Sequence, residues 1–478
     1  MEASAPAHVV LVSLPTQGHI NPFISVAHYL AASSICVTLI GSARLHSLLQ
    51  KFLTSAGCHN TEMSPIRLEV VPDGMPADTA QPMSPSAVMD SIIIIRTGVE
   101  AVLTKLMQEK QPPCCLIVDD LLAMWGQDVA IKFDLPWMML WTSSVYCFSV
   151  CFHVPELVNR GYLPATGEGS KEKIIDFVPG LSPFCIKDLP TPINVEEDLQ
   201  NHPMLHFFSN TVKHADRLLV NSIFELESSA VEALRKEAGF VVDPVGPLFM
   251  INSLSTDSHL PAVSLLQEDR RCLSWLDGQQ DSSVLYIAFG SVASVAGNVL
   301  VELAYGLEAS GVNFLWVIRS NALSDKLSVQ DFLPEGFVER TRDKGCIISW
   351  APQLAVLSHP SVGAFLTHCG WNSVLESLWN GVPMLGFPQE AEQNTNFKFV
   401  VHDMKLGLPL LETNVQQVER SRVQCAMTAI MQSDEGVELR KRALSIKEIA
   451  HKAARGSSKV NLEKLVNDLK SDRLKRSH

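Results

Sequence analysis

Residues 350–393 read WAPQLAVLSHPSVGAFLTHCGWNSVLESLWNGVPMLGFPQEAEQ, and this stretch decides the fold of the chain. The apolar run Val362–Leu366 has the length and composition of a buried strand, and Pro383–Phe387 is a second run of the same kind. Between them a polar turn, residues 367–373, opens a helical segment that continues to Leu378. A strand, a helix and a strand in this order predict a βαβ unit of a parallel sheet.

The same alternation extends toward both ends of the chain. The other predicted strands are His8–Ser13, Cys36–Ile40, Leu116–Val118, Trp137–Leu140, Ser283–Phe289, Asn313–Ile318 and Cys346–Ser349, with a helix over Val299–Ser310. After the first strand, Asn21 and Pro22 read as the N-cap and first turn of a helix, which places His19 on a loop. We therefore predict an α/β protein of two facing Rossmann-like domains with parallel sheets, whose ligands bind in the cleft between the domains at the strand ends.

The periodic pattern also suggests where the domains end. Residues from about 249 to 273 lose periodicity and gather Ser, Asn, Asp and Pro, as an interdomain linker does. We expect a first domain over 1–248, the linker over 249–273 and a second domain over 274–455. Residues 456–478 are expected to form a C-terminal helix that packs back toward the first domain.

Composition excludes several classes of function. The 478 residues carry 38 Lys and Arg against 51 Asp and Glu, a net charge of −13, so a nucleic-acid or anionic-membrane partner is not expected. Eleven scattered cysteines, an odd number, fit a reduced compartment. No basic leader precedes the first strand, and the uncharged segment Leu135–Pro155, although long enough to span a bilayer, is equally explained by a strand and a core helix. We expect a soluble cytoplasmic protein.

Several common catalytic signatures do not occur in the sequence. It contains no G-x-x-x-x-G-K-[ST] phosphate loop, no G-x-G-x-x-G after a strand, no H-E-x-x-H and no G-x-S-x-G. These absences argue together against a P-loop kinase, a simple dehydrogenase, a zinc hydrolase and a serine esterase.

What remains is a dense group of polar residues at strand ends in the second half. The turn before the predicted helix offers free backbone N–H groups to an anion, Gly370 permits close approach, and His368, Asn372 and Ser373 add donors, as a diphosphate requires. One turn further, Glu376 is placed to accept hydrogen bonds from ribose hydroxyls.

Two neighbouring strand ends complete this group. Trp350 can stack on a nucleobase, and Glu392 with Gln393 suits sugar hydroxyls. Taken singly, each residue has a plainer reading as a core tryptophan, a helix cap or a solvated helix face.

As a string, residues 350–393 closely resemble the signature box of plant secondary-product UDP-glycosyltransferases. The resemblance also covers PTQGHINP from Pro15, KDLP at Lys187, VGPL at Val245 and FGSVAS at Phe289, and so most of the chain. It implies the GT-B fold of two Rossmann-like domains, with the acceptor bound by the first domain and the UDP-sugar by the second.

The resemblance also implies roles for individual residues. Trp350 and Ala351 match contacts to uracil, Gln353 and Glu376 contacts to ribose, and His368, Asn372 and Ser373, with Ser291 in addition, contacts to the diphosphate. Trp371, Glu392, Gln393 and Thr142 match contacts to the sugar. In two places the sequence departs from the pattern, because Phe387 replaces a usual Trp and Glu392 a commoner Asp, which bears on the fit of the sugar.

His19 matches the catalytic histidine of that family, and its partner is one of two adjacent aspartates. The family's carboxylate stands eight residues before the Asp of a D-V-A-like motif, here Asp128, and this spacing selects Asp120 over Asp119. The implied reaction is inverting transfer, in which His19 takes the proton of an acceptor hydroxyl and Asp120 assists it. The scheme needs no cofactor and no metal, and the sequence contains no D-x-D pair.

The sequence also gives an expectation for the sugar donor and for the acceptor. Gln393 resembles members that use glucose, so UDP-glucose is the expected donor. The acceptor pocket is expected near Pro82–Ser86, Ile92–Ile95, Tyr146–Phe152 and Pro179–Leu189, whose apolar and aromatic content suits a flavonoid or other phenolic, or a terpenoid or sterol. A C-glycosylating enzyme, a UDP-sugar epimerase or hydrolase, and a non-catalytic UDP-sugar sensor are the alternatives. A monomer is the expected state.

Overall fold

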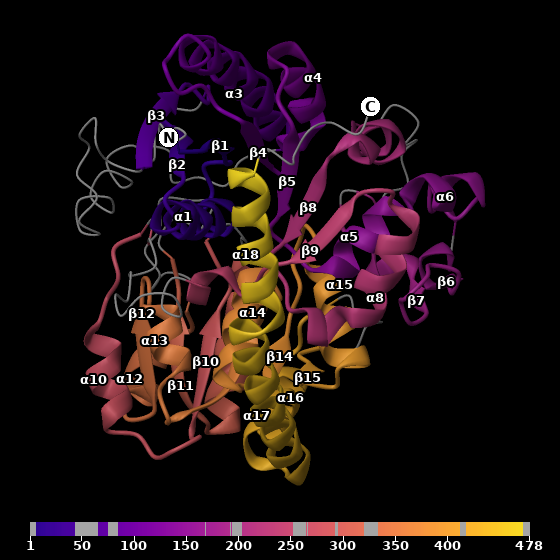
Figure 1. The fold of residues 1–478 in the computed structure, drawn as a ribbon. Helices are drawn as coiled ribbons and strands as arrows, with labels where there is room; N and C mark the ends of the chain where they lie inside the picture. The colour runs from indigo at the N-terminus through magenta and orange to yellow at the C-terminus, as the bar shows by residue number, and fades with distance from the viewer. Residues whose placement is uncertain are drawn as a thin grey trace.

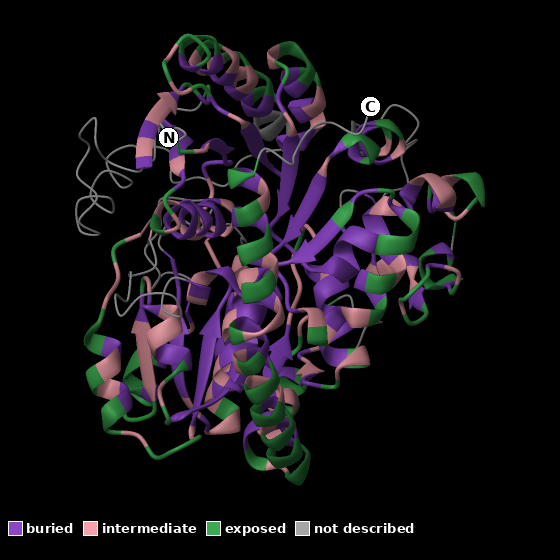
Figure 2. Ribbon diagram, viewed as in Figure 1, coloured by how far each residue is buried: buried purple, intermediate pink, exposed green. Residues whose placement is uncertain are grey.

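The computed structural model describes residues 6–43, 66–74, 85–167, 169–191, 193, 203–251, 264, 266–291, 295–319, 333–411 and 417–471. Most of the predicted linker and the end of the predicted C-terminal segment lie outside these ranges. Two parallel sheets stand one above the other, each covered by helices on both faces (Figure 1). The central strands are buried, the edge strands β3 (Ile66–Val71) and β12 (Gly345–Ile348) are partly exposed, and the outer helices carry many of the exposed residues (Figure 2), as expected when helices cover both faces of a parallel sheet.

The first sheet is built from the N-terminal half of the chain. Its seven strands follow the order β3-β2-β1-β4-β5-β8-β9, and every pair is parallel. The strands are β1 (His8–Val12), β2 (Cys36–Ser42), β3 (Ile66–Val71), β4 (Cys115–Asp119), β5 (Trp137–Trp141), β8 (Arg217–Val220) and β9 (Val241–Pro244). The covering helices are α1 (Gln17–Ala32), α3 (Pro85–Leu106), α4 (Ala123–Phe133), α5 (Val145–Phe152), α6 (Val154–Asn159) and α8 (Phe224–Glu237), with a small antiparallel pair of β6 (Ile174–Ile175) and β7 (Phe184–Cys185).

The second sheet belongs to the C-terminal half. Its six parallel strands follow the order β12-β11-β10-β13-β14-β15. They are β10 (Val284–Ala288), β11 (Asn313–Val317), β12 (Gly345–Ile348), β13 (Val362–Thr367), β14 (Met384–Gly386) and β15 (Gly407–Pro409). The helices are α10 (Arg271–Asp277), α11 (Gly297–Ser310), α12 (Phe337–Thr341), α13 (Gln353–Leu357), α14 (Trp371–Asn380), α15 (Gln393–Phe397), α16 (Arg420–Gln432) and α17 (Asp434–Arg455).

The last helix, α18 (Ser457–Lys470), leaves the second half and runs along the first sheet (Figure 1). Leu462, Leu465 and Leu469 are buried in the same apolar cluster as the β1 residues Val9 and Leu11. A guanidinium on β8 supports this packing, because Arg217, itself buried, forms an ion pair with Asp468. Helix α18 is thereby fixed to the N-terminal sheet. The domain boundaries at 248, 273 and 455 stay a prediction.

The fold predicted from the sequence is confirmed, and one local prediction is wrong. Helix α1 begins at Gln17 with Thr16 as its N-cap, so Pro22 lies inside the helix and His19 in its first turn. Pro22 is the sixth residue of this helix, past the first turn, so its missing N–H leaves the carbonyl of Gly18 without its intrahelical partner. His19 is therefore held by a helix and not by a loop.

The uncharged segment Leu135–Pro155 is divided between β5 and α5, a buried strand followed by a core helix. Among the helices in the described ranges, none is both long and apolar enough to cross a membrane. Every described cysteine is a free thiol.

Candidate active site

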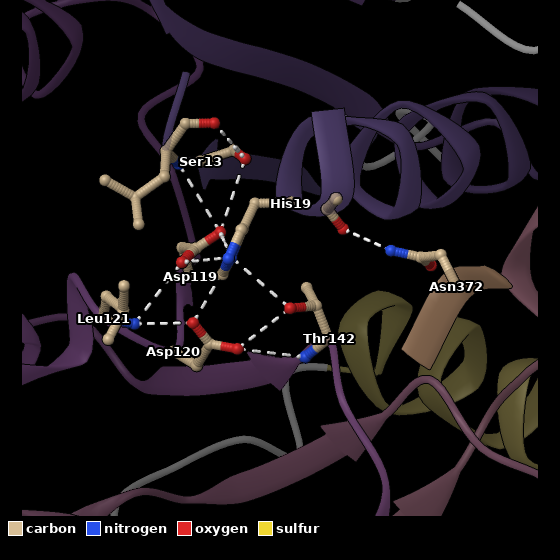
Figure 3. Close-up of polar contacts among 9 residues, drawn as sticks. Ser13, His19, Asp119, Asp120, Leu121, Thr142 and Asn372 are labelled. Carbon is tan, nitrogen blue, oxygen red and sulfur yellow. Dashed lines mark hydrogen bonds and ion pairs between the residues drawn. The ribbon is translucent and has the colours of Figure 1, made fainter. Parts of the chain in front are cut away.

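Four neighbouring strands of the first sheet, β1, β4, β5 and β8, end in polar residues. These are Ser13, the pair Asp119 and Asp120, Thr142, and Asn221. Because the carboxyl ends of parallel strands share one edge of a sheet, these side chains gather at the edge that faces the second half. His19 comes to the same place from the first turn of α1 (Figure 3).

Two carboxylates contact the imidazole of His19 at Nδ1. This atom lies 3.0 and 3.1 Å from the two carboxylate oxygens of Asp119, and 3.3 Å from Oδ1 of Asp120. Ionised carboxylates only accept hydrogen bonds, so Nδ1 carries the proton and the lone pair of the neutral ring is on Nε2. The side chain of His19 is 24% exposed, which leaves it accessible from the cleft.

The structure adds Asp119 to the pair that the sequence predicted. The eight-residue spacing selects Asp120, but Nδ1 of His19 lies closer to the oxygens of Asp119, at 3.0 and 3.1 Å, than to Oδ1 of Asp120, at 3.3 Å. Burial opposes charge on the imidazole, yet the two carboxylates raise the pKa of His19 well above its usual value. The assignment of Asp120 stays a prediction, and it concerns one of two carboxylates in contact with the ring.

Thr142 lies on the other side of Asp120. Its backbone N–H and its hydroxyl donate to Oδ2 of Asp120 at 3.2 and 3.0 Å, and its Oγ1 is 3.3 Å from Nδ1 of His19. Thr142, which was expected near the sugar, therefore forms hydrogen bonds with the residues around His19.

On the second sheet, the predicted anion turn lies between β13 and α14. Gly370 is the N-cap of α14, so the N–H groups of the first helical turn have no carbonyl partner within the helix. The ring of His368 is packed so closely between two glycines that a Cβ on Gly290 or on Gly370 would lie 2.6 or 2.4 Å from Nε2. Nδ1 of His368 is buried without a hydrogen-bond partner, and burial lowers the pKa of this histidine to about 4. At neutral pH it offers an N–H group and no charge.

Two asparagines join this turn to the first sheet. The side chain of Asn372 donates to the carbonyl oxygen of Gly18 at 2.8 Å and accepts from Nδ2 of Asn221 at 3.1 Å. The indole of Trp371 donates to the carbonyl oxygen of Asn221 at 2.7 Å and is 2% exposed. The Trp371 side chain is thus part of the contact between the two halves, and a sugar contact by this residue would come from its backbone.

Of the residues assigned to the nucleoside, Trp350, Ala351 and Gln353 follow β12, and Glu376 lies on α14. Gln353 donates from Nε2 to Ser373 at 2.9 Å and to Glu376 at 2.8 Å, and accepts from Tyr286 at 3.2 Å. Burial raises the pKa of Glu376 to about 7. Trp350 donates from its indole to Ser264 at 2.8 Å. Gln353 and Glu376, which the sequence assigned to one ribose, are in direct contact.

Glu392 and Gln393 follow β14 at the start of α15. Glu392 accepts a 3.3 Å hydrogen bond from Asn396, burial raises its pKa, and it interacts electrostatically with His19 and Asp120. This residue of the second half is therefore close enough to influence the charge of the histidine in the first half. Gln393 is buried and uses its carbonyl oxygen to accept from the N–H groups of Gln389 and Glu390.

The structure describes some of the segments that were expected to line an acceptor pocket. The side chains of Pro82–Ser86 lie outside the described residues, whereas Ile92, Ile95, Phe148 and Phe184 are buried in the apolar core of the first half. Tyr146 accepts from Nζ of the buried Lys398 at 2.8 Å, so this part of α5 contacts the second half.

Two polar residues near the candidate site, Asn221 and Arg319, were not predicted from the sequence. Asn221 follows β8, a four-residue strand too short to give a clear local pattern. Arg319 follows β11, is buried, and donates from Nη1 to the carbonyl oxygen of Ser291 at 2.5 Å. Both stand directly after strands at the cleft edge, so strand-end position was the signal that could have found them.

The three residues of the acid–base cluster are also of the types that bind metal ions. In the described part of the chain, His19, Asp119 and Asp120 form the one group of three such side chains whose ligand atoms lie within 4.8 Å of one another. Nδ1 of His19 is already engaged with the carboxylates, so we interpret the group as a hydrogen-bonded acid–base cluster.

Comparison with known proteins agrees with this geometry. Residues 23–446 match the family model "UDP-glucoronosyl and UDP-glucosyl transferase". The chain is 31% identical over 487 residues to UDP-glycosyltransferase 86A1 of Arabidopsis thaliana, covering 98% of this chain and 95% of that protein. It is 32% identical over 488 residues to 7-deoxyloganetin glucosyltransferase of Catharanthus roseus, covering 98% and 97%.

Solved structures show the same likeness. The complex of Phytolacca americana UGT2 with UDP-2fluoro-glucose and pterostilbene superposes with a TM-score of 0.80 at 30% identity, over 97% of this chain and 99% of that chain. The complex of TcCGT1 with UDP gives a TM-score of 0.81 at 27% identity, over 98% and 100%.

Proposed function

The chain belongs to the family of UDP-glucuronosyl and UDP-glucosyl transferases and has their GT-B fold, and from this premise we propose that it transfers glucose from UDP-glucose to a hydroxyl of a small lipophilic acceptor. Membership makes it an enzyme that transfers a sugar from a UDP-sugar. The observation that carries the finer proposal is the set of carboxylate contacts to Nδ1 of His19, which leaves Nε2 as the ring nitrogen that can accept a proton.

In the proposed mechanism His19 is the general base. Nε2 takes the proton of the acceptor hydroxyl, and the positive charge that forms on the ring is stabilised by the carboxylate of Asp120 at 3.3 Å from Nδ1. The acceptor oxygen then bonds to C1 of the glucose as the bond from C1 to the diphosphate oxygen breaks. Attack from the side opposite the leaving group inverts the configuration at C1.

The leaving diphosphate gains negative charge during this step. The turn around Gly370 supplies the N–H groups at the start of α14, to which Asn372 and Ser373 add side-chain donors and the neutral His368 a ring donor. Ser291 belongs to the same proposed set, because its loop follows β10, the strand next to β13. Local dipoles of this kind suit a chain whose net charge is −13.

The remaining donor contacts are proposed in the order uracil, ribose, sugar. The base stacks on Trp350 and bonds the backbone of Ala351, the ribose meets Gln353 and Glu376, and the sugar meets Thr142, Glu392, Gln393 and the backbone of Trp371. Support for glucose comes from Gln393, which resembles glucose-using members, and from relatives named as glucosyltransferases.

For the acceptor we propose a flavonoid or another phenolic. Its support is the apolar, aromatic first half and the pterostilbene bound in a similar structure. A terpenoid-like acceptor is the second candidate, favoured by the relatives named 7-deoxyloganetin glucosyltransferase. We also propose that the enzyme needs no metal, acts as a monomer and works in the cytoplasm.

The test is product identification by mass spectrometry from UDP-glucose with a panel of phenols, terpenoids and sterols. UDP-galactose and UDP-xylose serve as competing donors, and a chelator tests the need for a metal. We expect a glucoside whose formation falls by about 10²- to 10⁴-fold in His19→Ala. Turnover of His19→Ala near wild type would contradict the mechanism. Release of free glucose at the full rate without an acceptor would favour a hydrolase.

A further inference from the structure

Two adjacent carboxylates, not one, contact the same ring nitrogen of His19. Residues next to each other in a strand point to opposite faces of the sheet, so a pair at positions 119 and 120 would not ordinarily share a target. Here Asp119 is the last residue of β4, paired in register with Leu140, and the chain turns at Asp120. The turn brings the second side chain back to the first.

Each carboxylate is anchored by a different strand. Asp119 accepts from the hydroxyl of Ser13 and the N–H of Leu14 after β1, both at 3.4 Å. Asp120 accepts from the N–H and the hydroxyl of Thr142 after β5 (Figure 3). The N–H of Leu121 lies between them, at 3.3 Å from Asp119 and 2.7 Å from Asp120. The two acids are therefore held from different strands, β1 and β5, and are joined by the N–H of Leu121.

Their environments also differ in charge. Asp119 is completely buried, and burial together with the neighbouring charge of Asp120 raises its pKa to about 7. For Asp120 burial acts in the same direction, but the imidazole and its hydrogen bonds prevail and lower its pKa to about 2. Glu392 is the other ionisable group that interacts with His19 and Asp120, from the opposite side of the cleft. Two carboxylates pressed together in this way do not both ionise freely.

We propose that His19 works with a carboxylate pair. Asp119 is the positioning residue whose carboxylate accepts the hydrogen bond of Nδ1–H. Asp120 links the histidine to Thr142, a residue of the proposed sugar site. This rests on the proposed function in that His19 is the base. The pair makes the imidazole a stronger base than one carboxylate would, because two acceptors beside Nδ1 favour the protonated ring.

The test compares Asp119→Asn with wild type in the full chain, by the pH profile of kcat/KM. Removing one carboxylate beside the ring should move the acid limb to lower pH by about 1–3 units, with the KM for UDP-glucose unchanged. Asp128→Asn is the matched control, because that carboxylate is exposed and pairs with Arg96, away from the histidine. An acid limb that coincides with wild type would overturn the proposal.

A second measurement does not need catalysis. The ring of His19 can be titrated by NMR in the ligand-free protein, with its signal assigned by its loss in His19→Gln. We expect a lower midpoint in Asp119→Asn than in wild type, and equal midpoints would reject the pair. If instead the wild type transfers no sugar to any acceptor while the midpoints differ, the proposed function fails and the carboxylate pair stands.

Discussion

The side-chain amide of Asn372 donates a 2.8 Å hydrogen bond to the backbone carbonyl of Gly18, one residue before His19. In a regular helix that carbonyl would accept from the N–H four residues later, but residue 22 is proline and has none. The proline inside α1 thus leaves a carbonyl that Asn372 satisfies from the start of α14. The proposed diphosphate site is in this way joined directly to the turn that carries the proposed base.

Asn372→Asp should therefore impair catalysis beyond its effect on donor binding. The new carboxylate cannot donate to the Gly18 carbonyl and leaves it unsatisfied, at a cost of about 1–3 kcal/mol, roughly a tenfold or larger loss in kcat/KM. The control is Asn380→Asp, which removes a similar 2.8 Å bond from an amide to a carbonyl at the other end of α14. Steady-state kinetics in which both variants keep wild-type kcat would refute the link.

Gly290→Ala should weaken the binding of UDP. Gly290 has φ +73°, and an added Cβ would lie 2.6 Å from the ring of His368. The methyl group would push the ring out of the proposed diphosphate site, and calorimetry with UDP measures the loss. Gly161→Ala is the matched control, since Gly161 also has φ +73° but nothing lies within 4 Å of its added Cβ. The left-handed conformation costs both variants about 1–2 kcal/mol, so only Gly290→Ala should lose affinity.

Lys398→Met should destabilise the contact between the two halves. Nζ of Lys398 donates to Tyr146 and Ser182 of the first half and pairs with Asp403 at 2.8 Å, and the lysine side chain is 6% exposed. Removing it leaves Asp403 with no cation at this contact, and we expect a loss of roughly 3 kcal/mol in the free energy of unfolding by denaturant. Lys441→Met, at an exposed pair with Glu438, should leave the transition unchanged. Equal transitions for the two variants would show that the buried pair stabilises nothing.

Glu227→Gln should change how stability depends on pH. Glu227 is buried, accepts from the N–H groups of Val145 and Tyr146 at the start of α5, and burial raises its pKa to about 7. A folded pKa above the unfolded value of 4.5 means that the stabilising contribution is complete below pH 4.5 and is lost as pH rises toward 7. Relative to Glu227→Gln, wild type should lose up to about 3 kcal/mol over this interval.

The check is denaturant unfolding of both proteins at several pH values between 4.5 and 8. Other carboxyls with raised pKa values, such as Glu376, are present in both proteins and cancel in the difference. The control is Glu225→Gln, an exposed change on the same helix, whose difference from wild type should stay constant with pH. A constant difference for Glu227→Gln as well would contradict the prediction.

The sequence by itself determined the architecture and the donor turn. The runs of β-branched residues that form β1, β2, β10 and β13 are local signals, and each lies within a residue or two of its predicted bounds. The residues proposed to bind UDP-glucose are mostly contained in one stretch of the chain, 350–393, so their spacing along β13, α14 and β14 already brought them together. The short strands β8, β9 and β15 were not predicted, because three or four residues give too little hydrophobic periodicity to identify a strand.

Only the tertiary structure decided which atoms meet across long distances in the chain. Asp119 bonds His19 over 100 residues of sequence, and Asn372 bonds Gly18 over 354. The eight-residue spacing of the family motif selected one aspartate, and it could not show that the chain turns at Asp120 and brings both side chains to the same nitrogen. The sequence also could not show that the indole of Trp371 donates to Asn221, so that a sugar contact of this residue falls to its backbone. Such contacts depend on how two sheets pack, because a hydrogen bond requires a position in space that no short segment of sequence specifies.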